Sequence, residues 1–432
     1  MVKQVRKFFI VFFVYLVLEG ALRKWVFPAF STELFLFKDL LVVGALFGFL
    51  GNSSSLRGED PSFLTGSENL LLWGWFFLFC GYFFVSGVSL SSIAGLRYYL
   101  IMLPLVLLTP QVIADTADLN RLAARYLWLA LAVSILGVAQ FFSPPDALIN
   151  RYAWAVAVMD VSTFGEGMTR ITGTFSYITP YAVYLQFMFL LALALFVQSD
   201  RGKQRMLWGV AIALLFVNIV MTGSRAPLLI SVVLAIPFLL SVLQEIYTIK
   251  GRVLPIMATL VIMGLLLFQF SDVFSMLSER NREARDERER IAGALMVPVV
   301  TLRDAEFVGA GVGSTFMGVR ELGRSSEGAG FDEVNSDRIG VEVGIFGYLF
   351  VLIFKLVFLW KAWGLYRSAT DRAIKTWALV VFAYQLSLLW SIPVYNSVAA
   401  AFYFASLGLY VFLRRQDTMM CAAASRQEVR IA

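Results

Sequence analysis

The sequence has no histidine, only two cysteines and few charged residues. Charged residues make up 15% of its 432 positions, whereas they make up about a quarter of a soluble domain. Without histidine the chain has no histidine base, no histidine metal ligand and no Ser-His-Asp triad. Cys80 lies in a predicted membrane span and Cys421 lies near the C-terminus, so we expect no disulfide framework. A side chain that acts as a catalytic base here must therefore be a carboxylate.

Long apolar runs dominate the remaining sequence. Hydrophobic residues make up 59% of the chain, and segments such as 206–221 and 226–243 approach or exceed the roughly 18 apolar residues that indicate a membrane span. The runs are continuous and do not alternate, which argues against a membrane β-barrel. Residues 8–22 lead into EGALRKWVFP without a small-residue cleavage site, so we expect a retained first span. The composition predicts an all-α polytopic membrane protein.

We predict about twelve transmembrane helices, which places both termini on one side of the membrane. The expected inner loops and tails hold nineteen lysines and arginines, and the short outer loops hold six. The positive-inside rule therefore predicts cytoplasmic termini. This distribution accounts for the net charge of +6 without a nucleic-acid partner. The predicted spans cover about 8–22, 34–50, 70–87, 98–114, 126–142, 180–197, 206–222, 226–243, 253–270, 341–360, 376–392 and 396–413.

Two outer segments are longer than turns. One covers about 143–179, and the other covers 271–340 with nine arginines, thirteen carboxylates and no lysine. Structureless loops of more than about 15 residues are usually functional or disordered, so we expect the activity at the outer face. The chain divides into residues 1–270 with spans one to nine, a large periplasmic loop at 271–340 with short helices, residues 341–413 with the last three spans, and a cytoplasmic tail at 414–432.

Several charged residues fall in or beside the predicted spans, where each is by default a candidate functional group. Glu19 and Arg23 are four residues apart, which places them on one helix face. A structural role is the alternative, because arginines near span ends also extend to lipid headgroups. Lys355 is expected toward the inner side. The charged residues expected at the outer level are Glu19, Arg23, Lys38, Asp39, Arg97, Arg170, Arg225 and Glu342.

The outer face favours arginine over lysine, which narrows the class of ligand. A guanidinium binds phosphate through two parallel hydrogen bonds and keeps its charge at any working pH. An outer-leaflet site with several arginines suits a lipid that carries a phosphate or diphosphate. The segment GAGVGSTF (309–316) lacks the Lys-Ser/Thr ending of a nucleotide-binding P-loop. We interpret its glycines as a tight turn in the outer loop.

The order and spacing of several segments resemble the bacterial O-antigen ligase and polymerase superfamily over roughly residues 165–350. RITGTFSYITPYAVYL (170–185) resembles its R-x-x-G-T-F signature, and MTGSRAPLL (221–229) resembles its Thr/Ser-x-Ser-Arg turn. GAGVGSTF and then EVNSDRIGVEVGIFGYLF (333–350) resemble its G-x-G and Glu-x-Gly-x-x-Gly run. The resemblance implies a GT-C-like glycosyltransferase that needs no metal and no cofactor. Such enzymes act on glycans linked to undecaprenyl diphosphate, at the periplasmic face of the bacterial inner membrane.

The resemblance also implies roles for individual arginines. Arg170 and Arg225 would bind the diphosphate and stabilise it as the leaving group, with Arg288 or Arg290 contributing from the loop. We add Arg97 to the diphosphate-binding candidates because it opens the fourth span on the outer side. Ligases, which transfer finished glycan to lipid A-core, place a histidine where this chain has Val334. That departure favours a polymerase, which extends a glycan on a lipid-linked acceptor, or a divergent exopolysaccharide member, and leaves a ligase as the alternative. A chain-length regulator or flippase and membrane lipids are further candidate partners.

Glycosyl transfer also needs a base for the acceptor hydroxyl. Asp332, Glu333 and Asp337 are the candidate catalytic carboxylates, and Glu342 is expected to brace the outer end of its helix. Two other functions stay open. A transporter or flippase of a lipid-linked or anionic solute would bind it near the midplane, between repeats with broken helices, and no convincing repeat is visible here. The other is a non-catalytic scaffold in a polysaccharide export complex. The expected supporting residues are Glu19, Arg23, Lys38, Asp39 and Glu342.

Overall fold

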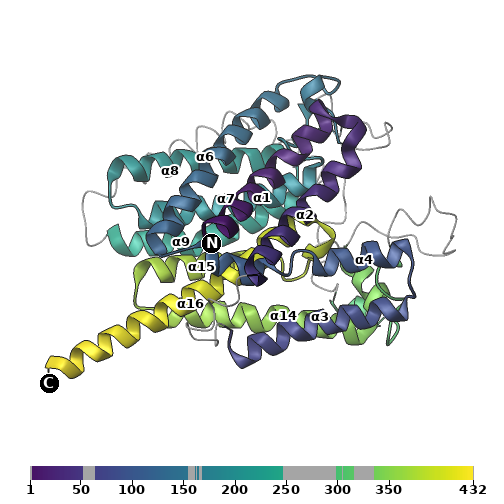
Figure 1. Cartoon of the computed structure of the whole chain (residues 1–432). Helices are drawn as coiled ribbons and strands as arrows, with labels where there is room; N and C mark the ends of the chain where they lie inside the picture. Colours follow the sequence, from purple (N-terminus) through teal and green to yellow (C-terminus); the bar gives the residue numbers. More distant parts are fainter. Residues whose placement is uncertain are drawn as a thin grey trace.

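The computed structural model describes residues 2–51, 64–153, 161, 163–164, 168–246, 298–303, 305–315 and 335–431. In these ranges the protein is a bundle of helices with one antiparallel pair of two-residue strands (Figure 1). The all-α fold class predicted from the sequence is confirmed. The strands are β1 (Thr163–Phe164) and β2 (Met168–Thr169).

The α-helices of the described residues follow one another through short turns for most of the chain. They are α1 (Val2–Ala21), α2 (Ser31–Leu50), α3 (Gly66–Val85), α4 (Leu90–Leu100), α5 (Leu105–Val112), α6 (Thr116–Phe141), α7 (Ile178–Gln198), α8 (Gly202–Met221), α9 (Arg225–Ile246), α14 (Asn335–Ser368), α15 (Arg372–Ser387) and α16 (Ser397–Ile431). Short helical turns are η1 (Leu22–Val26), η2 (Pro28–Phe30), η4 (Leu148–Asn150) and η6 (Pro393–Tyr395).

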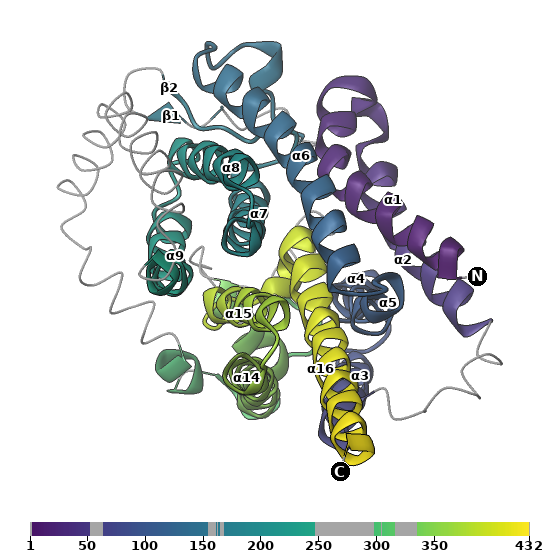
Figure 2. The same cartoon turned by 90° about the vertical axis from the view of Figure 1, so that its left-hand side faces the viewer.

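Seven helical segments in the described ranges are long and apolar enough to cross a membrane. Helix α7 lies at the centre of the bundle, packed against α6, α8, α9, α15 and α16 (Figure 2), and every residue of α7 from Tyr184 to Val197 is buried. Large apolar side chains such as Phe47, Leu70 and Phe77 are instead exposed on peripheral helices. Exposed apolar surface of this extent fits a bilayer rather than water.

Polar contacts gather at the two ends of the bundle. At one end the turn after α1 meets the loop before α7, where Trp25 Nε1 donates to the carbonyl of Leu148 at 3.0 Å. At the other end the start of α1 meets the start of α6, where Arg6 Nη2 donates to Asp118 Oδ1 at 2.8 Å. We call these the Trp25 end and the Arg6 end. The predicted orientation makes the Trp25 end periplasmic and the Arg6 end cytoplasmic.

A helix overlaps each predicted span except the ninth, 253–270, which lies outside the described residues. The structure divides the predicted span 98–114 into α4 and α5, which are separated by a turn before Leu105. It also breaks α14 at Gly344, whose φ of 61° and ψ of −169° are not helical. The predicted span 376–392 is too long at its end, because α15 stops at Ser387.

The early end of α15 explains why Lys355 is buried. Lys355 Nζ donates to the carbonyls of Leu388 at 2.7 Å and Leu389 at 3.1 Å, and also to the carbonyl of Ser391. Irregular backbone at membrane depth needs such internal partners because lipid offers none, and a cation also suits the negative end of the helix dipole. Lys355 therefore caps the end of α15, a role that its expected place toward the inner side did not suggest.

Candidate functional site

The site centres on residues 170–176, RITGTFS, which we call the Arg170 loop. Gln140 at the end of α6 holds this loop, because its Oε1 accepts from the amides of Thr172 at 3.1 Å and Gly173 at 2.7 Å. Gly173 has a φ of +53°, and a Cβ there would lie 2.8 Å from the Tyr181 ring. Only glycine fits both the left-handed backbone and the space. The loop is thus a buried, hydrogen-bonded structure that the β2 strand leads into.

The C-terminal end of α1 packs against one side of the Arg170 loop. A Cβ on Gly20 would lie 2.5 Å from the amide nitrogen of Ser176, so the absence of a side chain allows the two backbones to meet. Arg23 Nη1 donates to Ser176 Oγ at 3.1 Å. Lys24 Nζ donates to Thr172 Oγ1 at 3.0 Å and to the Gly173 carbonyl at 2.9 Å. The LEGALRKW segment is therefore a structural partner of the RITGTFS segment.

Lys24 lies in η1, beyond the first predicted span, and is almost fully buried. Burial lowers the pKa of Lys24 to about 7 because it disfavours the ammonium form. Its two hydrogen bonds to the Arg170 loop partly offset that cost, since an ammonium group can donate three. Lys24 therefore joins the end of α1 to the loop through a hydroxyl and a carbonyl.

The turn between α8 and α9 packs against the other side of the loop. Arg170 Nε donates to the Thr222 carbonyl at 2.9 Å, and the Ile171 amide donates to the Met221 carbonyl at 3.3 Å. Gly223 in this turn has a φ of +65°, a conformation that favours glycine. These contacts bring the RITGTFS and TGSR segments together. Arg225 follows Gly223 by two residues, so the two predicted diphosphate ligands, Arg170 and Arg225, belong to segments that touch each other.

Arg225 is the first residue of α9 and is half-buried. In the described part of the chain its side chain forms no hydrogen bond or ion pair. The Leu228 amide donates to the Ser224 carbonyl at 3.3 Å, so the helix starts at this point, with Pro227 in its first turn. Unsatisfied amides and the positive end of a helix dipole favour anions at such a start. Arg225 adds a full charge at the same position.

An ionic network links α1, α2 and α4 beside this site. Glu19 accepts from Arg23 Nη1 at 3.0 Å and from Lys38 Nζ at 2.7 Å. Arg97 Nε donates to Asp39 Oδ2. Lys38 and Glu19 are almost fully buried, so their charges compensate each other where desolvation is costly. Arg23 and Arg97 are thus committed to protein carboxylates, which supports their structural interpretation over diphosphate binding.

Three cations of the same network lie around the aromatic ring of Phe35. The Phe35 ring centroid lies 3.5 Å from Lys38 Nζ, 4.8 Å from Arg97 Cζ and 5.2 Å from Arg23 Cζ. Attraction to the ring face stabilises such cations by about 0.5–1 kcal/mol at exposed sites and more when they are desolvated. Phe35 therefore helps to hold Arg23, Lys38 and Arg97 together at the Trp25 end.

Glu342 forms a second polar cluster where α14 is broken. Its Oε2 accepts from the Tyr99 hydroxyl at 2.7 Å, and its Oε1 accepts from the hydroxyl and amide of Thr315. The Gly311 amide donates to the Glu342 carbonyl at 2.8 Å. Glu342 is 1% exposed, so it holds the GAGVGST turn against α14 and does more than brace a helix end.

The glycines of that turn are required by close contacts. Gly309, Gly311 and Gly313 all have φ between 78° and 91°, as a tight turn predicts. A Cβ on Gly311 would lie 2.8 Å from Ser86 Cα in the turn before α4. The predicted tight turn is confirmed, and it wedges between α4 and the break in α14. Arg338 Nη2 donates to the Thr315 carbonyl at 3.1 Å and closes the turn.

None of the contacts described above involves the side chain of a candidate base or of a candidate loop arginine. Asp332, Glu333, Arg288 and Arg290 lie outside the described residues. The backbone of Asp337 is in the first turn of α14, next to Arg338. Sequence reasoning missed Gln140, Tyr99, Tyr395 and Thr315 as members of the polar clusters, although a glutamine at the end of an apolar run is itself a signal. The Tyr99 and Tyr395 hydroxyls are 2.7 Å apart.

No protein-family model matches the chain, and no curated protein matches it either. The assignment of function must therefore rest on the residues themselves. Among the described ranges no three histidine, cysteine, aspartate or glutamate side chains cluster as metal ligands do. What the site offers chemically is a turn with small residues, Arg225 without a side-chain partner among the described residues, Arg170 bracing the turn, and a helix start. These groups can bind an anion at the Trp25 end.

Proposed function

We propose that this protein is a polymerase-type glycosyltransferase that uses an undecaprenyl-diphosphate-linked glycan as donor and a lipid-linked sugar as acceptor. In this proposal the chain has twelve spans and a GT-C-like fold, lies in the bacterial inner membrane with both termini in the cytoplasm, and works at the periplasmic face. The product is a longer O-antigen or exopolysaccharide chain on its lipid carrier.

One observation carries the proposal. The Arg170 side chain contacts the turn that presents Arg225, and Arg225 stands at the start of α9 without a partner among the described residues. Arginines that serve only the fold are committed to acceptors, as Arg23 and Arg97 are here. An uncommitted guanidinium at a helix start is suited to a diphosphate.

The chemistry then follows from charge. The acceptor hydroxyl oxygen attacks the anomeric carbon of the donor sugar, and the bond from that carbon to the diphosphate oxygen breaks. Arg225, braced with Arg170, stabilises the charge that develops on the departing diphosphate, as fixed cations do in phosphoryl and glycosyl transfer. A carboxylate among Asp332, Glu333 and Asp337 receives the proton of the hydroxyl. Undecaprenyl diphosphate leaves with both of its phosphates.

Purified full-length protein in liposomes provides the test. With an undecaprenyl-diphosphate-linked oligosaccharide as both donor and acceptor, we expect lipid-linked chains of two or more repeat units and release of free undecaprenyl diphosphate. A ligase would form product only when lipid A-core is added. If neither mixture gives any glycan product while the protein remains folded, glycosyl transfer is refuted.

A second candidate is a transporter of a lipid-linked or anionic solute, and two breaks in the helices favour it. Helix α14 is interrupted at Gly344, and α15 stops at Ser387 before an irregular segment that reaches Tyr395. Transporters often bind solute where helices are discontinuous. The backbone carbonyls that these two breaks leave without helical partners already accept hydrogen bonds from the GAGVGST turn and from Lys355. They are therefore not open to a solute, and we rank this candidate second. It predicts movement of labelled lipid between leaflets without any new glycosidic bond.

A further inference from the structure

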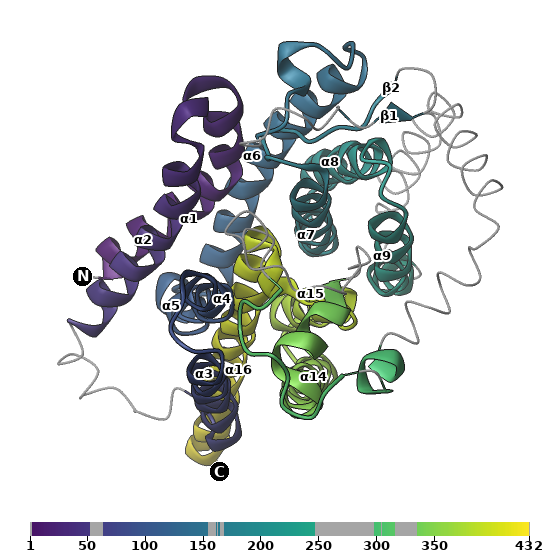
Figure 3. The ribbon, with the colours of Figure 1, turned by 90° about the vertical axis from the view of Figure 1, so that its right-hand side faces the viewer.

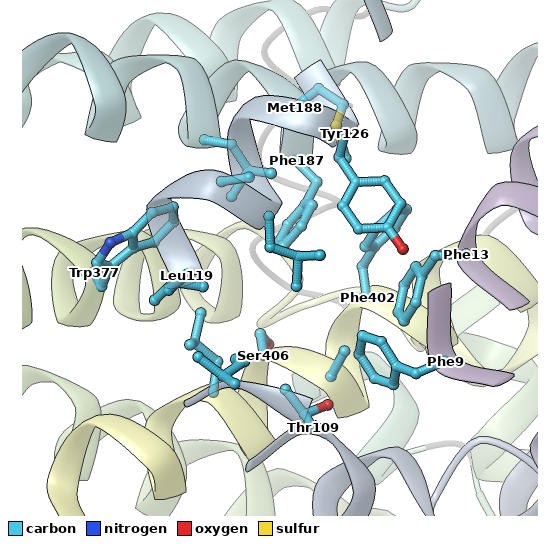
Figure 4. A pocket seen from close by; sticks show the side chains of 16 residues that line it. Phe9, Phe13, Thr109, Leu119, Tyr126, Phe187, Met188, Trp377, Phe402 and Ser406 are labelled. Carbon is cyan, nitrogen blue, oxygen red and sulfur yellow. The ribbon is translucent and has the colours of Figure 1, made fainter. Parts of the chain in front are cut away.

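An apolar cavity of about 80 Å³ lies near the Arg6 end of the bundle, away from Arg170 and Arg225. Side chains from α1, α5, α6, α7, α15 and α16 line it, among them Phe13, Phe187 and Phe402 (Figure 4). The first turn of α6 contributes Leu119 and the second turn of α15 contributes Trp377, and both helices start at the Arg6 end. None of the residues assigned to glycosyl transfer lines this space, so it needs an explanation of its own.

Water is a poor occupant of the cavity. A buried water needs two to four polar partners. Thr109 and Ser406 line the cavity, but their hydroxyls already donate to the carbonyls of Leu105 and Tyr403, each at 2.7 Å. The Tyr126 hydroxyl is buried without a hydrogen-bond partner in the described structure. One phenol cannot hold a water, so the space suits an apolar group.

Cations lie within about one helical turn of the cavity lining. Arg6 precedes the lining residue Phe9 by three positions and donates to Asp118 at 2.8 and 2.9 Å. Arg121 lies beside the lining residue Leu122, 3.4 Å from Asp118, with 61% of its side chain exposed. The cations on these two helix starts outnumber the carboxylates. They are Arg6, Lys7, Arg121 and Arg125, against Asp115 and Asp118.

We propose that the cavity holds an acyl chain of an anionic phospholipid whose headgroup lies on Arg121 and the neighbouring cations. An amphipathic, negatively charged molecule matches both the apolar space and the positive rim, whereas a zwitterionic lipid uses only the space. A polyprenyl diphosphate fits less well, because the anion site proposed for it is at the other end of the bundle. The inference does not depend on the glycosyltransferase proposal. The bound lipid fills a void between six helices and so links the core to the membrane.

Photolabelling of full-length protein in phosphatidylcholine vesicles tests this site. The probe is phosphatidylglycerol with a diazirine at the end of one acyl chain. We expect labelled peptides that contain Tyr126 and Phe402. Ala123→Leu fills the cavity and should reduce that labelling at least about fivefold, because packed interiors have no room for both groups. Ala117→Leu, on the exposed face of the same helix, should leave it unchanged.

The headgroup is tested with the matched diazirine phosphatidylcholine, which should label the cavity several times less than phosphatidylglycerol does. Arg121→Gln should remove most of that difference while the acyl site remains. Equal labelling by the two lipids in the wild-type protein, label confined to lipid-facing residues such as Trp128, or preferential labelling by a diazirine polyprenyl diphosphate would each overturn the proposal. The three contradicting outcomes are all measured on the wild-type chain, so they decide the question even if Ala123→Leu fails to fold.

Discussion

Gly20, the glycine of α1, should tolerate no side chain where the helix meets the Arg170 loop. In Gly20→Ala, the new Cβ would lie 2.5 Å from the Ser176 amide nitrogen and 2.6 Å from the Phe175 carbonyl carbon. The Thr174 carbonyl oxygen would be nearer still, at 2.4 Å, and ordinary contact begins at 3.4 Å, so the backbone must move by roughly 1 Å. The loop cannot yield easily, because Gln140, Lys24 and Arg23 all hold it. Overpacking of this kind costs typically about 1–3 kcal/mol, and we expect the upper end of that range.

The matched control for this prediction is Gly81→Ala, at an exposed position near the C-terminal end of α3. A Cβ at Gly81 would meet nothing within 4 Å, so this change should stabilise the helix by up to about 1 kcal/mol through better helix propensity. The assay is the free energy of unfolding in mixed detergent micelles for both variants. Opposite signs are predicted. If Gly20→Ala is as well tolerated as Gly81→Ala, the close approach between α1 and the Arg170 loop is wrong.

Three further predictions concern buried polar groups. Glu19→Gln should lower the unfolding free energy by about 3–5 kcal/mol, because it leaves the Lys38 ammonium uncompensated, and adding Lys38→Met should recover most of that loss in a double-mutant cycle. Lys355→Met should cost on the order of 3 kcal/mol by leaving carbonyls after α15 without a donor, which the same unfolding assay measures, and no loss would refute the capping role. Glu342→Gln should speed amide hydrogen exchange in residues 309–315, because a Gln side chain cannot accept hydrogen bonds at both of its terminal atoms. Unchanged exchange there would contradict the role of Glu342 in holding the turn.

The helical architecture was largely predictable because apolar run length decides it. Runs such as 180–197 and 206–222 match α7 and α8 within a few residues. The ends of α15 and the break in α14 could not be predicted the same way. Their apolar sequence continues past Ser387 and through Gly344, and the backbone departs from the helix only because Lys355 and the GAGVGST turn satisfy the freed groups. Such partners are distant in sequence, so local pattern does not reveal them.

The candidate site was predictable in its parts but not in its assembly. The sequence singled out Glu19, Arg23, Lys38, Asp39 and Arg97 as charges near one membrane level, and the structure joins them by ion pairs at the Trp25 end. The helices α1 and α2, which carry Glu19, Lys38 and Asp39, lie side by side (Figure 3). Spacing alone could pair only Glu19 with Arg23. The partners of the others come from different helices. The contrast between committed arginines and Arg225 emerges only when those pairings are known.

The most direct test of the central claim is the rate of glycosyl transfer in a single turnover with Arg225→Lys. Lysine keeps the charge but loses the planar pair of donors that matches a diphosphate. The control is Arg201→Lys at the exposed start of α8, which should react like the wild-type protein. The account predicts that Arg225→Lys slows transfer at least about tenfold, or about 1.4 kcal/mol of transition-state stabilisation, with normal folding. Transfer by Arg225→Lys at the wild-type rate would contradict it and leave Arg225 as a membrane anchor.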